Sequence, residues 1–234
     1  MKPDSRARKA WVRERRRATI EQFDVLDSPI YDREWGHIGP VHRDFVLGLV
    51  DSCPAGATIL DAACGTGKYF DLVLSRGQRV VGFDQSRGML AKAQEKYPGM
   101  PLAVVGLQEL AVRRPFEGTM CVDALECLPP EDWPEALRNL ARATVSGGTV
   151  YLTVERTTPE ILAEAERSAR ERGIPAVPGE LIDDPGAGAY HFYPTKTALR
   201  VWLSTAGLSP VREQDDEWAP GEGYWHLLCR VTEG

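Results

Sequence analysis

The sequence lacks the features that would place it in a membrane or in a secretory pathway. Its longest apolar runs, such as Thr149 to Val154, are far shorter than the roughly 18 to 20 residues that a membrane-spanning helix needs. The charged residues 1–17 are not followed by the apolar segment of a secretory signal. We therefore expect a cytoplasmic protein without a membrane span.

Cysteine and histidine are also scarce. The five cysteines form no C-x-x-C pair, and only four histidines accompany them. Neither a zinc site nor a disulfide framework is indicated by this pattern. We expect no metal, and we interpret His37 and His42 as surface or capping residues.

Positive charge is concentrated at one end of an acidic chain. The net charge is −6, but the first twenty residues hold eight basic and two acidic side chains, so the remainder carries −12. A basic arm can contact nucleic acid, although a solvated helix face is the more common meaning of such a run. The acidic body argues against a nucleic-acid partner, and no pattern indicates an oligomeric state.

Apolar residues are plentiful and regularly placed. They make up 43% of the 234 residues, enough for a large core. From residue 57, strand-like runs (58–60, 79–83, 102–105, 120–122 and 149–154) alternate with helical patterns (66–75, 86–96 and from 130 to the pair Gly147-Gly148). This alternation predicts an α/β fold with a doubly wound, mostly parallel sheet. Strands near Val211 and at 225–231 would complete seven, with an antiparallel edge.

The turn after the first expected strand reads ILDAACGTGKYF and contains two glycines one residue apart. A phosphate-binding P-loop would need Ser or Thr after Lys68, where Tyr69 stands, and a dinucleotide fingerprint would need glycine at Phe70. The turn also has a carboxylate, Asp61, four residues before the first of its two glycines, Gly65 and Gly67. Such an aspartate can also simply cap a helix.

This D-x-x-x-G-x-G turn resembles motif I of the class I S-adenosylmethionine-dependent methyltransferases. The match is chemically sensible, because that cofactor brings an ammonium and a sulfonium but no pyrophosphate. Asp84 ends the second strand, where an acid can accept hydrogen bonds from two ribose hydroxyls. Asp123 follows the fourth strand and resembles motif IV, whereas Leu107 stands where the family commonly has an acid, which leaves the adenine to Gln108 or to backbone groups.

The resemblance covers residues 57–155 and implies a cofactor site and a domain plan. The implied cofactor is S-adenosyl-L-methionine, bound by Tyr31, Trp35, Asp61, Ala63, Gly65, Gly67, Asp84, Gln85, Met89, Leu107, Gln108 and Asp123. Residues 1–56 would form a helical lid, and residues 57–234 a Rossmann-like domain. An insertion at about 156–194, after the fifth strand, would cap the acceptor.

The acceptor is less well defined by the sequence. The turn Asp123-Ala124-Leu125-Glu126 lacks the [DNS]-P-P-[YF] pattern of enzymes that methylate base amino groups or glutamine amides. We expect methylation of a small molecule at O or N in a biosynthetic pathway, with Tyr190, His191 and Tyr193 binding the substrate and with Glu126 and His191 as catalytic candidates. Three alternatives stay open: a non-methylating reaction with the same cofactor, RNA or protein methylation guided by the basic arm, and a partner subunit that keeps the fold without chemistry.

Overall fold

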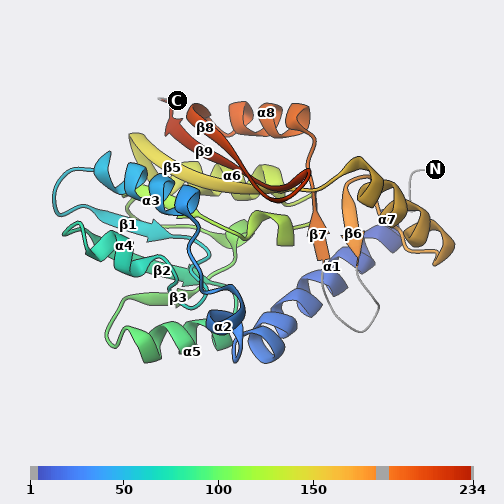
Figure 1. Cartoon of the computed structure of the whole chain (residues 1–234), viewed down its shortest axis with the longest axis horizontal. Coiled ribbons are helices and arrows are strands. Elements are labelled where there is room, and N and C mark those ends of the chain that lie inside the picture. The colour runs from blue at the N-terminus through green and yellow to red at the C-terminus, as the bar shows by residue number, and fades with distance from the viewer. Residues whose placement is uncertain (1–4, 183–189, 233–234) are drawn as a thin grey trace.

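A computed structural model describes residues 5–182 and 190–232 (Figure 1). Its central sheet has seven strands in the order β3-β2-β1-β4-β5-β9-β8. Strands β1 to β5 are parallel, and β9 runs antiparallel to both β5 and β8. The predicted sheet with an antiparallel edge is therefore confirmed. The strands are β1 (Thr58–Asp61), β2 (Arg79–Asp84), β3 (Leu102–Val104), β4 (Phe116–Cys121), β5 (Thr144–Arg156), β8 (Leu208–Ala219) and β9 (Glu222–Val231).

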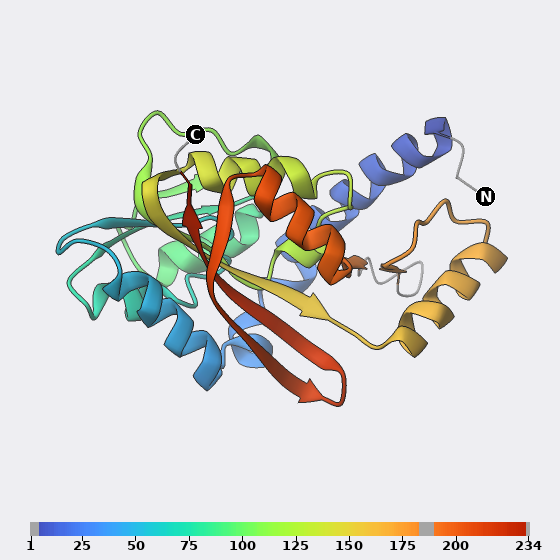
Figure 2. The same ribbon diagram turned by 90° about the horizontal axis from the view of Figure 1, so that it is seen from above.

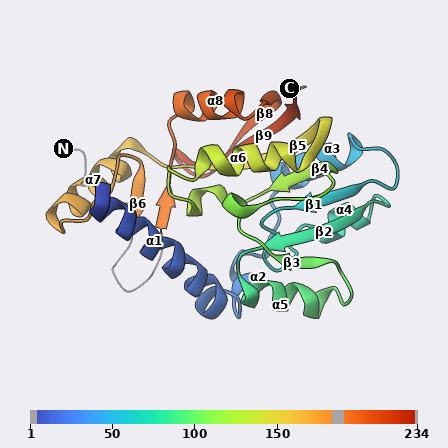
Figure 3. The same ribbon diagram turned by 180° about the vertical axis from the view of Figure 1, so that it is seen from behind.

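Helices cover both faces of the sheet because each carries an apolar stripe. One layer holds α3 (Pro40–Asp51), α4 (Phe70–Leu74) and α5 (Arg87–Lys96), and the other holds α6 (Trp133–Arg142) and α8 (Lys196–Thr205). Helix α3 lies in front of the sheet in Figure 1, whereas α6 comes to the front in Figure 3. Short 3-10 turns, η2 (Leu107–Glu109) and η3 (Leu125–Cys127), follow β3 and β4.

Two predicted boundaries beside glycines are wrong. The helix expected from Thr66 begins only at Phe70, because Gly65 and Gly67 adopt positive φ angles of 52° and 77° that no helix accommodates. Helix α6 ends at Arg142, before Gly147-Gly148. Those glycines lie inside β5, where the pairing with β4 shifts register, as in a β-bulge.

The N-terminal segment is helical, as expected, but its parts have different neighbours. It consists of α1 (Ser5–Glu21), a π-helical turn η1 (Gln22–Asp27), α2 (Tyr31–Trp35) and α3. In α3, Phe45 and Leu49 are fully buried in the core of the sheet. Helix α3 thus belongs to the sheet's helical layer, and the division at residue 56 stays a prediction.

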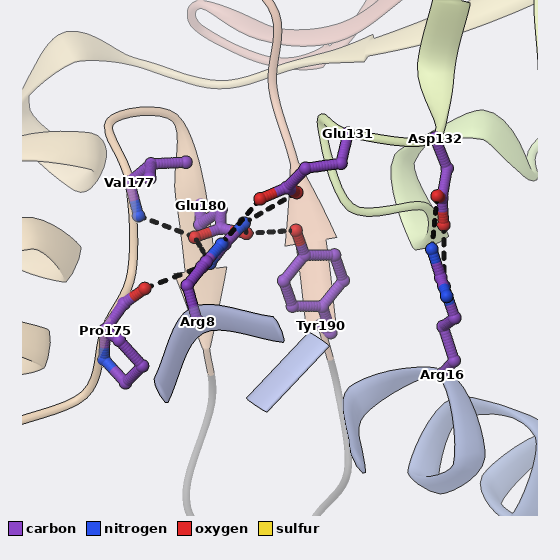
Figure 4. A network of polar contacts seen from close by, with 8 residues as sticks. All are labelled: Arg8, Arg16, Glu131, Asp132, Pro175, Val177, Glu180 and Tyr190. Carbon is purple, nitrogen blue, oxygen red and sulfur yellow. Dashed lines mark hydrogen bonds and ion pairs between the residues drawn. The ribbon is translucent and has the colours of Figure 1, made fainter. Parts of the chain in front are cut away.

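The segment after β5 forms a small subdomain with α1. It contains α7 (Pro159–Glu171) and the hairpin of β6 (Glu180–Ile182) and β7 (Tyr190–Phe192), and α1 crosses it (Figures 1 and 2). Arg8 of α1 bonds both oxygens of Glu131, at 2.7 and 2.9 Å, and both of Glu180, at 2.7 and 2.6 Å (Figure 4). The hydroxyl of Tyr190 also donates to Glu180, at 2.5 Å. These bonds fix the hairpin to α1 and to the start of α6.

Among the described residues, no helix is long and apolar enough to cross a membrane. Residues 183–189, which belong to the insertion expected to cap the acceptor, lie outside the described residues.

Candidate active site

A cavity opens at the carboxyl ends of β1, β2 and β4, where ligands of open α/β sheets bind. It encloses an empty volume of about 700 Å³, part of it open to solvent. We call it the glycine-turn cavity. Its walls come from the turn after β1, the ends of β2 and β3, the turn after β4, and the N-terminal residues Phe23 and Tyr31.

The glycine turn is held in a fixed shape by backbone bonds. The N–H of Cys64 donates to the carbonyl of Phe83 at 2.9 Å, and that of Gly67 donates to Cys64 at 2.8 Å. A side-chain carbon on Gly67 would lie 2.9 Å from Phe70, whereas one on Gly65 would meet no atom within 4 Å. Gly65 therefore presents bare backbone to open space in the cavity.

Asp84 joins the ends of β1 and β2. One carboxylate oxygen accepts the N–H of Gly65 and the other accepts the N–H of Ser86, each at 2.8 Å. Each oxygen keeps a second lone pair for a ligand. Burial raises the pKa of Asp84 to about 6, although these backbone N–H groups act in the opposite direction.

Asp61 lies at the end of β1 behind the cavity wall. Its side chain is 1% exposed, and burial with the nearby Asp84 charge raises its pKa well above the usual value. Among the described residues neither carboxylate oxygen has a hydrogen-bond partner of normal geometry, although the nearby backbone N–H of Ala63 acts to lower the pKa. Neither aspartate supplies an N-cap side chain, because α4 begins after Tyr69 and Ser86 itself caps α5.

Some of the predicted cofactor residues line the glycine-turn cavity, and others do not. Ala63, Gln85, Met89 and Leu107 line the glycine-turn cavity with Tyr31, Gly65, Asp84 and Asp123, whereas Asp61, Gly67, Gln108 and Trp35 do not. The Oε1 atom of Gln108 is buried without a hydrogen-bond partner in the part of the chain described. Sequence reasoning missed Phe23, Lys68 and Tyr69. For Lys68 and Tyr69, their place directly after Gly67 was an available signal.

A second cavity, which we call the outer cavity, adjoins the first. Its empty volume, including open solvent, is about 1,530 Å³. Its walls come from α2, the turn after β4, the cap strand β7 and the β8–β9 hairpin. Trp35 lines this cavity. The residues common to both cavities are Phe23, Tyr31, Lys68, Asp123 and Cys127.

Asp123 stands at the junction of the two cavities. Its φ of 52° is unusual for a residue other than glycine and marks a position worth testing for function. Its carboxylate accepts from the Tyr69 hydroxyl at 3.1 Å and lies 3.1 Å from Nε2 of His42 and 3.4 Å from Nζ of Lys68. Burial alone would raise the pKa of Asp123, but these partners hold it below its usual value. His42 is thus buried and paired, which corrects its interpretation as a surface or capping residue.

Glu126 and His191, the catalytic candidates, both line the outer cavity. Oε2 of Glu126 is buried and has no hydrogen-bond partner among the residues that the structure describes. Burial and the neighbouring Glu155 raise the pKa of Glu126 well above its usual value. Nδ1 of His191 lies 2.9 Å from Glu155 and 3.2 Å from the hydroxyl of Tyr193.

Tyr190 and His191 point to opposite sides of β7, because side chains alternate along a strand. His191 lines the outer cavity, whereas Tyr190 is 2% exposed and packs against Trp11 at a ring separation of 5.8 Å. The structure therefore places Tyr190 in the core of the cap. Tyr193 does not line the outer cavity, but its hydroxyl lies 3.2 Å from Nδ1 of His191, which does.

Three residues beside the outer cavity could together hold a metal ion. Donor atoms of His42, Asp216 and His226 lie within 4.8 Å of one another. Burial lowers the pKa of His226 to about 3, so its ring is neutral, and its Nδ1 lies 2.8 Å from the hydroxyl of Tyr151. The cluster was invisible in the sequence, because its members are far apart along the chain. The expectation of no metal stays a prediction.

Known proteins are similar to this chain in sequence. Residues 59–148 match the methyltransferase domain family. The chain is 28% identical over 153 residues to a ubiquinone biosynthesis O-methyltransferase of Pseudomonas paraeruginosa, covering 61% of this chain and 65% of that protein. It is 27% identical over 202 residues to the enzyme of the same name from Xanthomonas campestris, covering 81% and 79%.

A solved structure shares the fold over nearly the whole chain. It is the 1,6-didemethyltoxoflavin-N1-methyltransferase of Burkholderia thailandensis with bound 1,6-didemethyltoxoflavin and S-adenosylhomocysteine. The TM-score is 0.68 at 18% identity, over 93% of this chain and 90% of that chain. Residues 59–148 of this chain are therefore similar to a methyltransferase domain, and the chain as a whole shares the fold of a solved methyltransferase.

Proposed function

We propose that this protein methylates a small molecule at oxygen or nitrogen, as a step of a biosynthetic pathway. The observation that carries the proposal is the continuity of the two cavities through their shared lining residues. A cofactor in the glycine-turn cavity would face an acceptor in the outer cavity. The proposal includes both oxygen and nitrogen as the methylated atom, because the relatives are named for O-methylation and the solved structure for N-methylation.

The cofactor residues fit this role by charge and by space. When bound, S-adenosylmethionine supplies a methyl group on a positively charged sulfur, and transfer leaves S-adenosylhomocysteine while the acceptor loses a proton. Asp84 would accept from the ribose hydroxyls, and Gly65 would let the backbone approach. Asp123 would place negative charge beside the cationic groups.

We propose that one of two groups of the outer cavity takes the proton. Glu126 has a free buried oxygen, and its raised pKa brings it closer to the range in which a carboxylate works as a base. His191 has its Nδ1 engaged by Glu155, which leaves Nε2 as the proton acceptor. In-line transfer to an acceptor that is already deprotonated would need neither group.

The N-terminal segment would act as the lid of this site. Asp24 accepts from the N–H of Gly88 at 2.9 Å and from the Ser86 hydroxyl at 2.7 Å, which fixes η1 to the start of α5. Asp32 accepts from Thr66 at 2.5 Å and from Lys96 at 2.9 Å. The alternative that uses the basic arm for RNA or protein is weakened, since Arg8 and Arg16 pair with Glu131, Glu180 and Asp132 inside the protein.

The test is incubation with methyl-labelled S-adenosylmethionine and three acceptor pools: a library of small phenols, alcohols and amines, total RNA, and a protein mixture. We expect label in the small-molecule pool, with one S-adenosylhomocysteine formed for each methyl transferred. Label confined to RNA or protein would favour the basic arm, and reversing the exposed Lys9 and Arg13 to Glu should then abolish it. Acceptor turnover without S-adenosylhomocysteine would point to the non-methylating alternative.

A further inference from the structure

The outer cavity is strongly acidic. Carboxylates along its walls outnumber the cationic side chains, of which Lys68 is the one lysine in the described lining. Lys68 already lies 3.4 Å from Asp123, which also accepts from Tyr69 and pairs with His42. Elsewhere on its walls Arg33 pairs with Glu34 at 2.7 Å and Arg156 pairs with Glu217 at 3.4 Å, whereas Glu126 in the interior forms no ion pair with the described residues.

Two of the unneutralised carboxylates are neighbours in the interior of this cavity. Glu126 is 4% exposed and one of its oxygens has no partner among described atoms, whereas Glu155 pairs with His191 at 2.9 Å. Burying a charged carboxylate without a partner is costly, by several kcal/mol on general grounds. The repulsion between Glu126 and Glu155 adds to that cost. Both penalties favour a protonated Glu126 in the empty cavity, and a cation placed beside the two carboxylates would instead favour the ionised pair.

Aromatic rings stand around the same space. Trp218 and Tyr224 of the β8–β9 hairpin lie 4.9 Å apart between ring centroids, and Tyr31 and Trp35 of α2 lie 5.5 Å apart. All four line the outer cavity. Aromatic faces attract ammonium groups and also stack on flat ligands. The combination of aromatic walls and buried carboxylates suits an aromatic amine better than a neutral or acidic compound.

We propose that the acceptor is a small molecule that carries a protonated amine beside a flat apolar group, and that Glu126 and Glu155 bind its ammonium. This inference rests on the proposed function, because it assigns the chemical class of the molecule in the outer cavity. The ammonium donates to the free oxygen of Glu126, and the aromatic walls hold the apolar part. The binding determinant is the charge, and the methylated atom can be another atom of the same molecule.

Three probes of equal size test the charge directly: tyramine, tyrosol and 4-hydroxyphenylacetate, which end in an ammonium, a hydroxyl and a carboxylate. Each is titrated by calorimetry into protein saturated with S-adenosylhomocysteine near neutral pH. We expect tyramine to bind at least about tenfold more tightly than tyrosol, and the carboxylate to bind most weakly, in line with the value of one charge-assisted hydrogen bond. Equal binding, a reversed order, or no binding of tyramine would overturn the proposal.

Two variants test which carboxylate causes the preference for tyramine. Glu126→Gln keeps the shape of the side chain, and should reduce the advantage of tyramine over tyrosol to less than about threefold while leaving S-adenosylhomocysteine affinity unchanged. Glu34→Gln is the matched control, because Glu34 lines the same cavity but is exposed. It should change each affinity by less than about twofold. If Glu126→Gln does not fold, the ranking of the three probes on the unmodified protein decides.

Two further outcomes are informative. Loss of the tyramine preference after treatment with a chelator would mean that a metal ion at His42, Asp216 and His226 mediates binding, and would contradict a direct ammonium site. Failure to bind S-adenosylhomocysteine would instead refute the proposed function. Normal S-adenosylhomocysteine binding without amine selectivity would leave that function standing and refute only the present inference.

Discussion

The glycine-turn cavity and the outer cavity meet at Asp123, yet they are built in opposite ways. The first is made mainly of short turns that directly follow β1, β2, β3 and β4, and Asp84 in it is held by two backbone N–H groups. The second collects residues from α2, η3, β7 and the β8–β9 hairpin, and Glu126 in it has a buried oxygen without a partner in the described structure. The difference fits the proposed function, in which a preformed cofactor site lies beside an acceptor site that its ligand completes.

The same contrast extends to how each site is supported. The glycine turn is anchored to β2 through Cys64 and Phe83, within the central sheet. The cap wall of the outer cavity depends on α1 through the Arg8 network (Figure 4). A substitution in α1 that breaks the Arg8 network should therefore change the wall of the outer cavity and leave the glycine-turn cavity unchanged.

The largest effect is expected from Arg8→Ala. Removing Arg8 leaves Glu180, whose side chain is fully buried, without its cation, and breaking a buried pair in this way costs about 3 to 5 kcal/mol. Chemical denaturation should show this loss, and hydrogen exchange should show weaker protection in β6 and β7. Affinity for S-adenosylhomocysteine in the folded variant should change by less than about twofold.

The control is Lys9→Ala, which changes the adjacent exposed side chain and should leave stability within about 0.5 kcal/mol of the parent. If Arg8→Ala weakened S-adenosylhomocysteine binding as much as it loosened the hairpin, the two cavities would not be independent, and the comparison between them would fail.

Sequence reasoning recovered one cavity far better than the other, and chain distance is the reason. Asp61, Gly65 and Gly67 lie within seven residues of each other, so a local pattern identified their turn, and strand alternation placed Asp84 and Asp123 at the same edge of the sheet. Trp218 and Tyr224 come from a hairpin that was expected only as an edge, and its meeting with α2 is set by tertiary packing. The buried role of His42 was missed for the same reason, because its partner Asp123 is 81 residues away.

A pair of glycine variants sharpens the claim that the first cavity is preformed. Gly65 and Gly77 both have positive φ, and an added side-chain carbon would meet no protein atom within 4 Å at either position. Changing either to Ala should cost about 1 to 2 kcal/mol of stability, because both backbones are left-handed. Only Gly65→Ala should also weaken S-adenosylhomocysteine binding, by at least about tenfold, since its methyl group would occupy ligand space.

Calorimetry of the two variants separates strain from ligand contact. Gly77 lies just after α4, away from the lining residues of the glycine-turn cavity, so Gly77→Ala should bind S-adenosylhomocysteine as the parent does. Equal weakening in both variants would mean that backbone strain acts at a distance, and the Gly65 backbone would then not be a contact surface.

The smallest effect concerns the protonation of Asp84, whose pKa is raised by burial from its ordinary value of 3.8 to about 6. Between these two values the folded protein holds a proton that the unfolded chain has released. The contribution of Asp84 to stability is therefore complete below the lower value and is lost as the pH rises through about 6. Binding has the opposite sign, because ribose hydroxyls donate best to the ionised carboxylate.

Affinity for S-adenosylhomocysteine should accordingly fall as the pH drops below about 6, by at most about tenfold per pH unit for one competing proton. Calorimetry across this range should give a flat profile for Asp84→Asn, at a lower affinity throughout. Asp24 and Asp61 also act on Asp84, so the variant is needed to assign the slope. A slope that persisted in Asp84→Asn would come from another buried carboxyl, with Asp61 behind the wall as the first candidate, and the ionisation of Asp84 would then not set the pH dependence of binding.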